Sequence, residues 1–186
     1  MRVFLKKHRK WLLPAVAFIF LAIAFFTSNP GQAVLASAVN RQLPIYCVQK
    51  DSKVVSLSFD AAWGNEDTQQ LIDILGKYKI KATFFVVGQW VDKYPESVTA
   101  LHAAGHEVMN HSDTHPYMTK LSEQEIIQNV TACDNKIEAI TGVKPCLFRP
   151  PYGDYNDKVV NTLKSIDHYT IQWDVDTSHI KIKHQA

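Results

Sequence analysis

The sequence predicts an α/β fold in which parallel strands alternate with helices. Three observations support this prediction: short apolar runs rich in β-branched and aromatic residues, helical spacing of apolar residues between them, and breaker residues where one pattern gives way to the next. The chain has 186 residues, of which 46% are hydrophobic, enough for one domain with a buried core. Strands that alternate with helices of roughly 10–15 residues are typical of βα units and a parallel sheet.

The amino-terminal segment, residues 1–32, predicts a signal anchor or a signal peptide. Basic residues cluster between Arg2 and Lys10, directly before an uncharged apolar run from Trp11 to Phe26. The run is somewhat shorter than the ~20 residues of a membrane span, and residues 27–32 could complete it. The small residues from Ala36 to Ala38 would suit cleavage, so both readings stay open. In either case we expect the basic end in the cytoplasm and the remainder to be exported, either anchored in the cell membrane or secreted.

The next segment, residues 33–52, predicts a linker, because Pro44 and the lack of periodicity argue against regular structure. The predicted domain covers residues 53–186. The chain's net charge is +2, and its basic excess lies in the amino-terminal cluster. We therefore expect no nucleic-acid partner.

Five strands are expected in the domain, each as a short apolar run. The second is continuously apolar, as expected for a strand that is covered on both faces. The five ranges are Val54–Phe59, Ala82–Val87, His106–Asn110, Cys146–Phe148 and Tyr169–Val175.

Two helices are expected before the third strand. Asp67 or Thr68 can cap the first of them, whose apolar residues recur at helical spacing. Pro95 suits the first turn of the second helix, which should end at Gly105.

Two more helices are expected after the third strand. Ser122 and Glu125 have the spacing of a capping box, and Gly142 is placed to end this long helix. The last helix should run through Val159 and Leu163, before the fifth strand.

The three cysteines, Cys47, Cys133 and Cys146, have no metal-ligand spacing. In an exported protein Cys133 and Cys146 could form a disulfide, but two buried thiols fit the sequence equally well. The cysteines therefore favour no particular function.

Polar side chains stand where the predicted strands end. These are Asp60, His111 and Arg149 after the first, third and fourth strands, and Asp174 and Asp176 at the end of the fifth. The carboxyl ends of parallel strands face the active site in α/β folds. We expect these residues to converge on one rim of the sheet.

The pair His111 and His115 is a candidate metal site, because imidazoles four residues apart can reach a single ion. Two ordinary surface histidines would give the same spacing. Pro116 favours a loop over a helix. A zinc protease would need Glu beside the first histidine, where Ser112 stands, so the sequence argues against that class.

Three motifs in the predicted strand-end loops resemble those of the NodB-type polysaccharide deacetylases, or carbohydrate esterase family four. They are residues 58–64 (SFDAAWG), 111–116 (HSDTHP) and 149–153 (RPPYG), and residues 82–85 (ATFF) resemble the family's second strand. The resemblance runs from about Lys53 to Asp176 and is greatest to the sporulation-associated branch. It implies a distorted (β/α) barrel and an enzyme that removes acetyl groups from chitin-like or peptidoglycan polysaccharide, with a divalent metal, usually zinc.

The resemblance also implies roles for individual residues. Asp60 matches the general base, and His111 and His115 match the two histidine ligands of the metal. Arg149 matches the residue that positions the base. Tyr152 matches the position whose backbone N–H helps to hold the oxyanion. This set suits amide hydrolysis, because a metal ion acidifies water and a backbone N–H stabilises the developing negative charge.

Two further residues, Trp173 and Asp176, resemble the start of the family's fourth motif, which lines the pocket and braces the arginine. The family then continues to a Leu-x-His motif whose histidine protonates the leaving amine. Residues 178–186 do not match it, and neither His179 nor His184 follows an apolar strand. We therefore expect a barrel that is incomplete at its carboxyl end.

A second departure concerns the metal. The family's common pattern has a second Asp after the base as the third protein ligand, and Ala61 stands there. Asp113 could replace that ligand in principle, although a turn role suits it equally. We expect zinc to be held weakly. Two interpretations stay open: an active deacetylase, or a non-catalytic glycan-binding relative of one.

Overall fold

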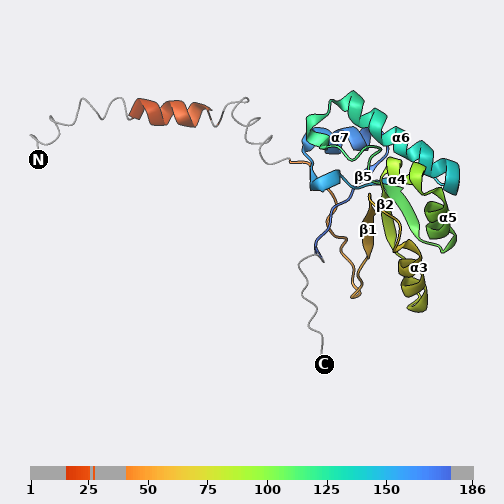
Figure 1. The fold of residues 1–186 in the computed structure, drawn as a ribbon. Coiled ribbons are helices and arrows are strands. Elements are labelled where there is room, and N and C mark those ends of the chain that lie inside the picture. Colours follow the sequence, from red (N-terminus) through yellow and green to blue (C-terminus); the bar gives the residue numbers. More distant parts are fainter. Residues whose placement is uncertain (1–15, 26, 28–40, 177–186) are drawn as a thin grey trace, which may run out of the picture. The chain divides into compact units, whose positions relative to one another are not determined.

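The computed structural model describes residues 16–25, 27 and 41–176 (Figure 1). The predicted basic cluster, the first residues of the apolar run and the predicted tail at 177–186 lie outside the described residues. The chain divides into two compact units, the second of which begins at Gln42. Each unit is described separately.

The first unit contains a helix over residues 16–25, with mostly exposed apolar side chains. Within the described ranges, no helix has the length and apolarity that crossing a membrane requires.

The second unit is an α/β fold built on a parallel sheet of five strands, as predicted from the sequence. The spatial order β1-β2-β3-β4-β5 follows the chain, as it does for successive strands of a (β/α) barrel. In the described part of the chain the sheet is not closed into a barrel. The strands are β1 (Ser58–Ala61), β2 (Thr83–Val86), β3 (Glu107–Asn110), β4 (Leu147–Phe148) and β5 (Tyr169–Thr170).

The first strand begins later than predicted, because its neighbour β2 begins at Thr83 and pairs with Ser58. Val54 and Val55 precede this pairing and are exposed. β-branched residues alone therefore did not fix the start of the strand, since a ladder needs a partner.

The fifth strand is shorter than predicted, although Tyr169–Thr170 lies within the predicted range. Its neighbour β4 ends at Phe148, and Pro150 and Pro151 cannot donate backbone hydrogen bonds. Beyond β5, Ile171 forms an isolated parallel bridge with Ile45. Ile45 lies in the segment predicted to be a linker.

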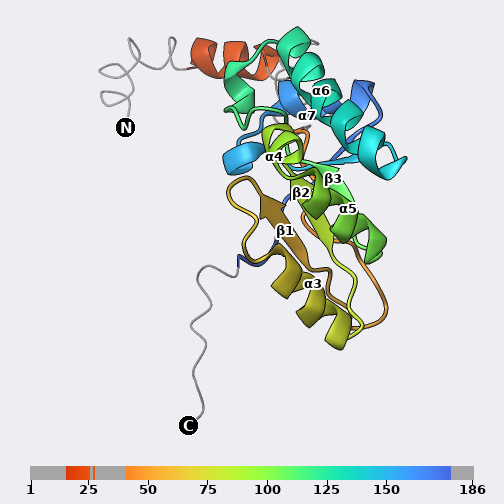
Figure 2. The same cartoon turned by 45° about the vertical axis from the view of Figure 1, so that its right-hand side comes forward.

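Helices connect the strands, and helices that follow one another in the chain are neighbours in space (Figures 1 and 2). Right-handed crossovers between sequential parallel strands place helices on a single face of the sheet. All four predicted helices are present: α3 (Thr68–Lys77), α5 (Pro95–Ala103), α6 (Glu123–Thr141) and α7 (Asp157–Ser165).

Three short elements were not predicted. They are α4 (Gly88–Lys93) and the 3₁₀ turns η1 (Met118–Lys120) and η2 (Pro151–Gly153). None is long enough to show a helical repeat of apolar residues, which is the signal used for the others.

The ends of α6 match the sequence prediction in detail. Ser122 and Glu125 form the reciprocal capping box, and Gly142 ends the helix with φ of 71°. Glycine adopts this left-handed conformation without the steric cost that a Cβ would bring.

Two apolar clusters form the core between the sheet and its helices. One surrounds Phe84 and Val86 of β2, and the other surrounds Phe148 of β4. Cys133 is buried in the first cluster, whereas Cys146 is exposed and both are free thiols, so the disulfide considered from the sequence is not formed. Burial raises the pKa of the Cys133 thiol, which keeps it protonated and unreactive.

Candidate functional site

An ion pair between Asp60 and Arg149 forms the centre of the candidate site. Asp60 lies on β1, and Arg149 follows β4 directly. Arg149 Nη1 donates a hydrogen bond of 2.7 Å to Asp60 Oδ1, and Arg149 Nη2 donates one of 2.7 Å to Ser58 Oγ. Side chains two residues apart share a face of a strand, so Ser58 and Asp60 meet the same guanidinium.

The Arg149 side chain is buried and lies against two aromatic rings. It is only 4% exposed. Its Cζ lies 4.1 Å from the ring centroid of Phe85 and 5.7 Å from that of Trp173. An arginine held on aromatic faces loses little further freedom when it binds a carboxylate. Arg149 therefore fixes one oxygen of Asp60 and leaves the other open.

The His111 ring is oriented by the backbone of Arg149. His111 Nδ1 lies 2.7 Å from the Arg149 carbonyl oxygen, which can only accept, so Nδ1 carries the proton in the neutral ring. The unprotonated Nε2 then lies 3.9 Å from Asp60 Oδ2. This tautomer leaves Nε2 free to act as a ligand.

The second imidazole, His115, lies beside the first, with ring centroids 5.0 Å apart. Two imidazoles that bind one zinc ion at 2.0–2.1 Å and a tetrahedral angle have centroids about 5 Å apart. His115 Nδ1 is buried and has no hydrogen-bond partner among the described residues. The pair therefore fits a divalent cation as two of its ligands.

Both histidines are neutral at physiological pH. Burial lowers the pKa of His111 and of His115 below the usual value of 6.5, although the Asp60 carboxylate opposes the shift. Neutral imidazole is the form that binds a metal.

A third protein ligand is not found at the expected places. Ala61 ends β1 and offers no side-chain oxygen. The Asp113 carboxylate forms an ion pair with Lys136, whose Nζ lies 2.6 Å from Asp113 Oδ1. Within the described ranges no group of three or more His, Cys, Asp or Glu is placed to hold a metal ion. The residues fit a weak two-histidine site beside one carboxylate.

Gly88 permits this placement of Asp113. A Cβ at Gly88 would lie 2.0 Å from Asp113 Oδ1. The close approach of α4 to the histidine loop, residues 111–116, therefore requires glycine.

Three residues of the site loops have left-handed backbone conformations. They are Ser112 (φ 72°), His115 (φ 55°) and Tyr152 (φ 58°). Non-glycine residues in this region cost energy and cluster at functional sites. The strain lies in two of the three segments whose motifs predicted chemistry, residues 111–116 and 149–153.

Exposed aromatic rings surround His115. The Tyr152 ring lies 4.6 Å from His115 and stacks on Tyr117 at 4.4 Å, and Trp63 lies 5.9 Å from His115. Tyr117, Tyr152 and Trp63 are 47%, 58% and 80% exposed, so flat apolar surface borders the two imidazoles.

The structure brings Asp60, Arg149, His111, His115 and Tyr152 together at the carboxyl ends of β1, β3 and β4. Trp173 joins them through its contact with Arg149. Asp174 and Asp176 are exposed and lie beyond the end of β5. Sequence reasoning missed Ser58 and Tyr117. The position of Ser58 two residues before Asp60 was the signal that could have found it.

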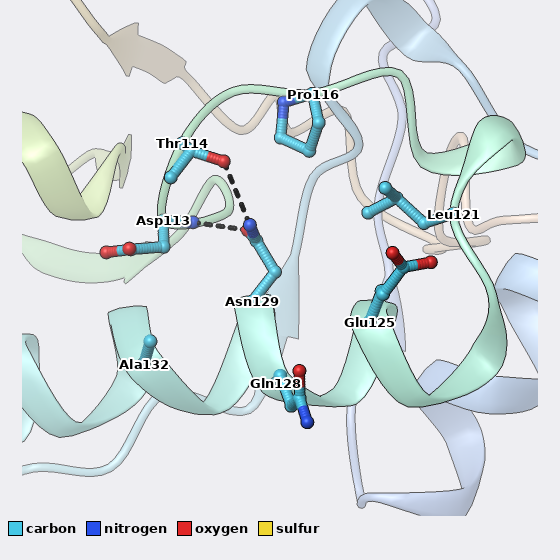
Figure 3. A pocket seen from close by; sticks show the side chains of 8 residues that line it. All are labelled: Asp113, Thr114, Pro116, Leu121, Glu125, Gln128, Asn129 and Ala132. Carbon is cyan, nitrogen blue, oxygen red and sulfur yellow. Dashed lines mark hydrogen bonds between the residues drawn. The ribbon is translucent and has the colours of Figure 1, made fainter.

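A shallow pocket lies on the outer side of the histidine loop (Figure 3). Asn129 of α6 spans it, accepting from the Asp113 backbone N–H at 2.7 Å and donating to Thr114 Oγ1 at 3.0 Å. The pocket contains neither the ion pair nor the two imidazoles. It is lined by Asp113, Thr114, Pro116, Leu121, Glu125, Gln128, Asn129 and Ala132.

Comparison with known proteins gives a family for this chain. Residues 48–171 match the family model for polysaccharide deacetylase. Peptidoglycan-N-acetylmuramic acid deacetylase PdaC of Bacillus subtilis is 42% identical over 129 residues, which cover 69% of this chain and 27% of that protein. The chain thus spans well under half the length of this relative.

Solved structures give the same result. A CE4 family pseudoenzyme from Bacillus anthracis is 40% identical with a TM-score of 0.70, over 73% of this chain and 48% of that one. A mutant of that pseudoenzyme, described as having restored enzymatic activity, is 41% identical with a TM-score of 0.71, over 73% and 50%.

Proposed function

This chain belongs to the polysaccharide deacetylase family, and from that premise we propose that it carries a hydrolase domain that removes N-acetyl groups from peptidoglycan sugars. One observation carries the proposal: His111 Nε2 lies 3.9 Å from the carboxylate of the Asp60–Arg149 ion pair, and the neutral His115 ring lies beside that of His111. The peptidoglycan substrate is suggested by the name of the relative PdaC.

In the proposed reaction Asp60 acts as general base. Arg149 holds Oδ1, so Oδ2 takes a proton from the attacking water. The water oxygen bonds to the acetyl carbon, and the Tyr152 backbone N–H donates to the oxyanion. The C–N bond then breaks as the nitrogen takes a proton from solvent, and Asp60 releases to solvent the proton that it took, giving acetate and a free amine.

His111 and His115 would hold a divalent cation, and zinc suits two imidazoles. Such an ion, when bound, would supply Lewis acidity that lowers the pKa of water and polarises the acetyl group. His111 contributes by orientation, because its Nδ1–H is fixed on the Arg149 carbonyl and its Nε2 is presented to the site.

Acetate release from peptidoglycan in the presence of Zn²⁺ tests this function. Asp60→Asn keeps the size of the side chain and removes the base, so the rate should fall by about 10²–10⁴-fold. Asp73→Asn is the matched control, because Asp73 is an exposed aspartate on α3. Acetate release that is equal in Asp60→Asn and wild type would reject the proposed base.

A second candidate function is binding of glycan without catalysis. It is favoured by Ala61, which supplies no ligand where the family's pattern has a carboxylate, and by the similarity to a described pseudoenzyme. A peptidoglycan pull-down together with the acetate-release assay distinguishes the binding protein from the enzyme. A chain that retains peptidoglycan in a pull-down but releases no acetate, with or without added Zn²⁺, would be a binding protein.

We further propose that the domain acts outside the cytoplasm. The support is the basic cluster followed by an apolar run in the first 26 residues. Peptidoglycan itself lies outside the membrane, so the two proposals agree.

A further inference from the structure

A chain of buried polar groups connects α6 and β5 to the histidine loop. Asn110, at the end of β3, and Ser112, in the loop, are fully buried. Asp134 on α6 and His168 before β5 are 2% and 4% exposed. Buried polar groups are costly unless they are paired, so each needs an account of its partners.

His168 forms a buried ion pair. Its Nδ1 lies 2.9 Å from the Ile166 carbonyl oxygen, and its Nε2 lies 3.2 Å from Asp134 Oδ1. Both partners are acceptors, so both ring nitrogens carry protons. His168 is therefore an imidazolium paired with the Asp134 carboxylate.

Asn110 connects Asp134 to the histidine loop through hydrogen bonds on both sides of its amide. Its Nδ2 donates to Asp134 Oδ1 at 2.7 Å and to the Val130 carbonyl at 2.9 Å. Its Oδ1 accepts from the Ser112 backbone N–H at 2.7 Å. The opposite amide orientation would place NH₂ against N–H, so the orientation of Asn110 is fixed. Hydrogen bonds to a carboxylate are stronger than neutral ones, and they polarise the amide they hold.

Ser112 is the strained residue between the two imidazoles. Its left-handed backbone is held by Asn110, and its own Oγ accepts from the His115 backbone N–H at 3.0 Å. A strained conformation persists only where surrounding contacts determine it. The Asn110 contact is the inner one, and Asn129 holds the loop from outside (Figure 3).

We propose that Asn110, Asp134 and His168 are positioning residues that hold the histidine loop in the conformation bringing both imidazoles to Asp60. None of the three reaches the reacting atoms. The importance of that conformation for deacetylation rests on the proposed function, but the control of the loop does not.

The simpler alternative is that the three residues only stabilise the core. The two ideas differ in what Asp134→Asn changes. A core role lowers protection throughout the sheet, whereas a positioning role acts first on Ser112 and His115. Amide hydrogen exchange in the metal-free chain, followed residue by residue, separates local from global opening.

We expect Asp134→Asn to speed exchange of the Ser112 and His115 amides by at least about tenfold, relative to Phe84 and Val108 in the sheet. His106→Gln is the control at another buried polar position. His106 is 4% exposed, but it lies at the amino end of β3, opposite to the end that the loop follows, and its Nδ1 accepts from the Ala82 backbone N–H. This control should change exchange at Ser112 no more than elsewhere.

Asn110→Asp, alone and combined with Asp134→Asn, distinguishes a local change in the loop from misfolding of the whole domain. Asn110→Asp would place two carboxylates together and should open the loop. Adding Asp134→Asn removes the repulsion between the carboxylates and should restore protection in part, because the contacts with the Val130 carbonyl and His168 stay altered. Exchange at Ser112 that tracks the sheet in all these variants would overturn the proposal.

Zinc affinity, measured by calorimetry in an Ala61→Asp background, gives an independent readout. Groups that orient metal ligands typically change affinity by about 10–100-fold, and we expect Asp134→Asn to lower it in that range. Unchanged affinity together with an unchanged loop would overturn the positioning role and leave the deacetylase proposal intact. If Asp134→Asn opens the loop but the wild-type chain itself releases no acetate, the deacetylase proposal is rejected and the positioning role is supported.

Discussion

The residue at position 61 determines how firmly the candidate site can hold a cation. Ala61 ends β1 next to Asp60, and in register with Val86. Two neutral imidazoles bind zinc through two bonds, whereas structural and catalytic zinc sites use three or four protein ligands. Under the proposed function, the low zinc affinity that we expect is therefore due to one side chain at the end of β1.

We expect Ala61→Asp to raise zinc affinity by at least about tenfold, or about 1.4 kcal/mol of binding free energy. The added carboxylate is charged and adjoins Asp60. Isothermal calorimetry measures the change. His111→Ala should abolish binding in both backgrounds, and an affinity that Ala61→Asp leaves unchanged would reject the metal site.

The buried His168–Asp134 pair predicts a pH dependence of stability. Burial lowers the pKa of His168, but the hydrogen bonds to Asp134 and the Ile166 carbonyl and the Asp134 charge outweigh it and the opposing charge of Lys144, so the pKa is raised above 6.5. A raised pKa in the folded state stabilises the fold below the unfolded value and loses that effect as the pH rises through the folded value.

The contribution of His168 to the free energy of unfolding should therefore decrease as the pH rises above about 6.5, the unfolded value. The lowered pKa values of His111 and His115 change stability in the opposite sense, mainly below that pH, so the prediction concerns the difference between wild type and His168→Gln. Urea denaturation across this range measures it. His168→Gln should remove this part of the dependence, and a wild-type curve parallel to that of His168→Gln would contradict the ion pair.

At this scale the sequence predicted the residues that carry chemical signatures. Asp60, His111, His115 and Arg149 were found because their types are unusual at strand ends and their order resembles a known motif set. The sequence did not reveal Asn110, Asp134 and His168, because their link joins residues far apart in the chain through the interior. No local pattern encodes such a link.

At the scale of elements, strong local signals determined what could be predicted. The ends of α6 were predicted because a capping box and a terminal glycine act within a few residues. The extent of β1 and β5 was not, because a strand ends where its neighbour stops pairing. The short helix α4 carries too few residues to show a period.

The α6 cap gives a stability prediction. Ser122 Oγ accepts from the Glu125 N–H, and the Glu125 carboxylate accepts from the Ser122 N–H at 2.7 Å. Ser122→Ala should lower the free energy of unfolding by about 1 kcal/mol. Asn135→Ala, at an exposed position within α6, is the control and should not lower it. Chemical denaturation that shows equal effects of the two changes would contradict the role of the cap.

At the scale of the whole molecule, the sequential order of parallel strands explains why the site forms. Every strand of the sheet points the same way, so residues at the carboxyl ends of β1, β3 and β4 meet at one end. The alternation of strands and helices in the sequence predicted this end. The conformations of the loops there, with three left-handed non-glycine residues, follow from tertiary contacts and were not predictable.

The first 26 residues predict on which side of the membrane the domain acts. Moving the basic cluster between Arg2 and Lys10 across a membrane is unfavourable, so the apolar run that follows should direct the domain outward. A reporter enzyme that is active only after export, fused after Asp60, should therefore be active in intact cells. The same reporter fused after Lys10 lacks the apolar run and should be silent. An intact Asp60 fusion that accumulates without activity would place the domain in the cytoplasm, away from the peptidoglycan proposed as its substrate.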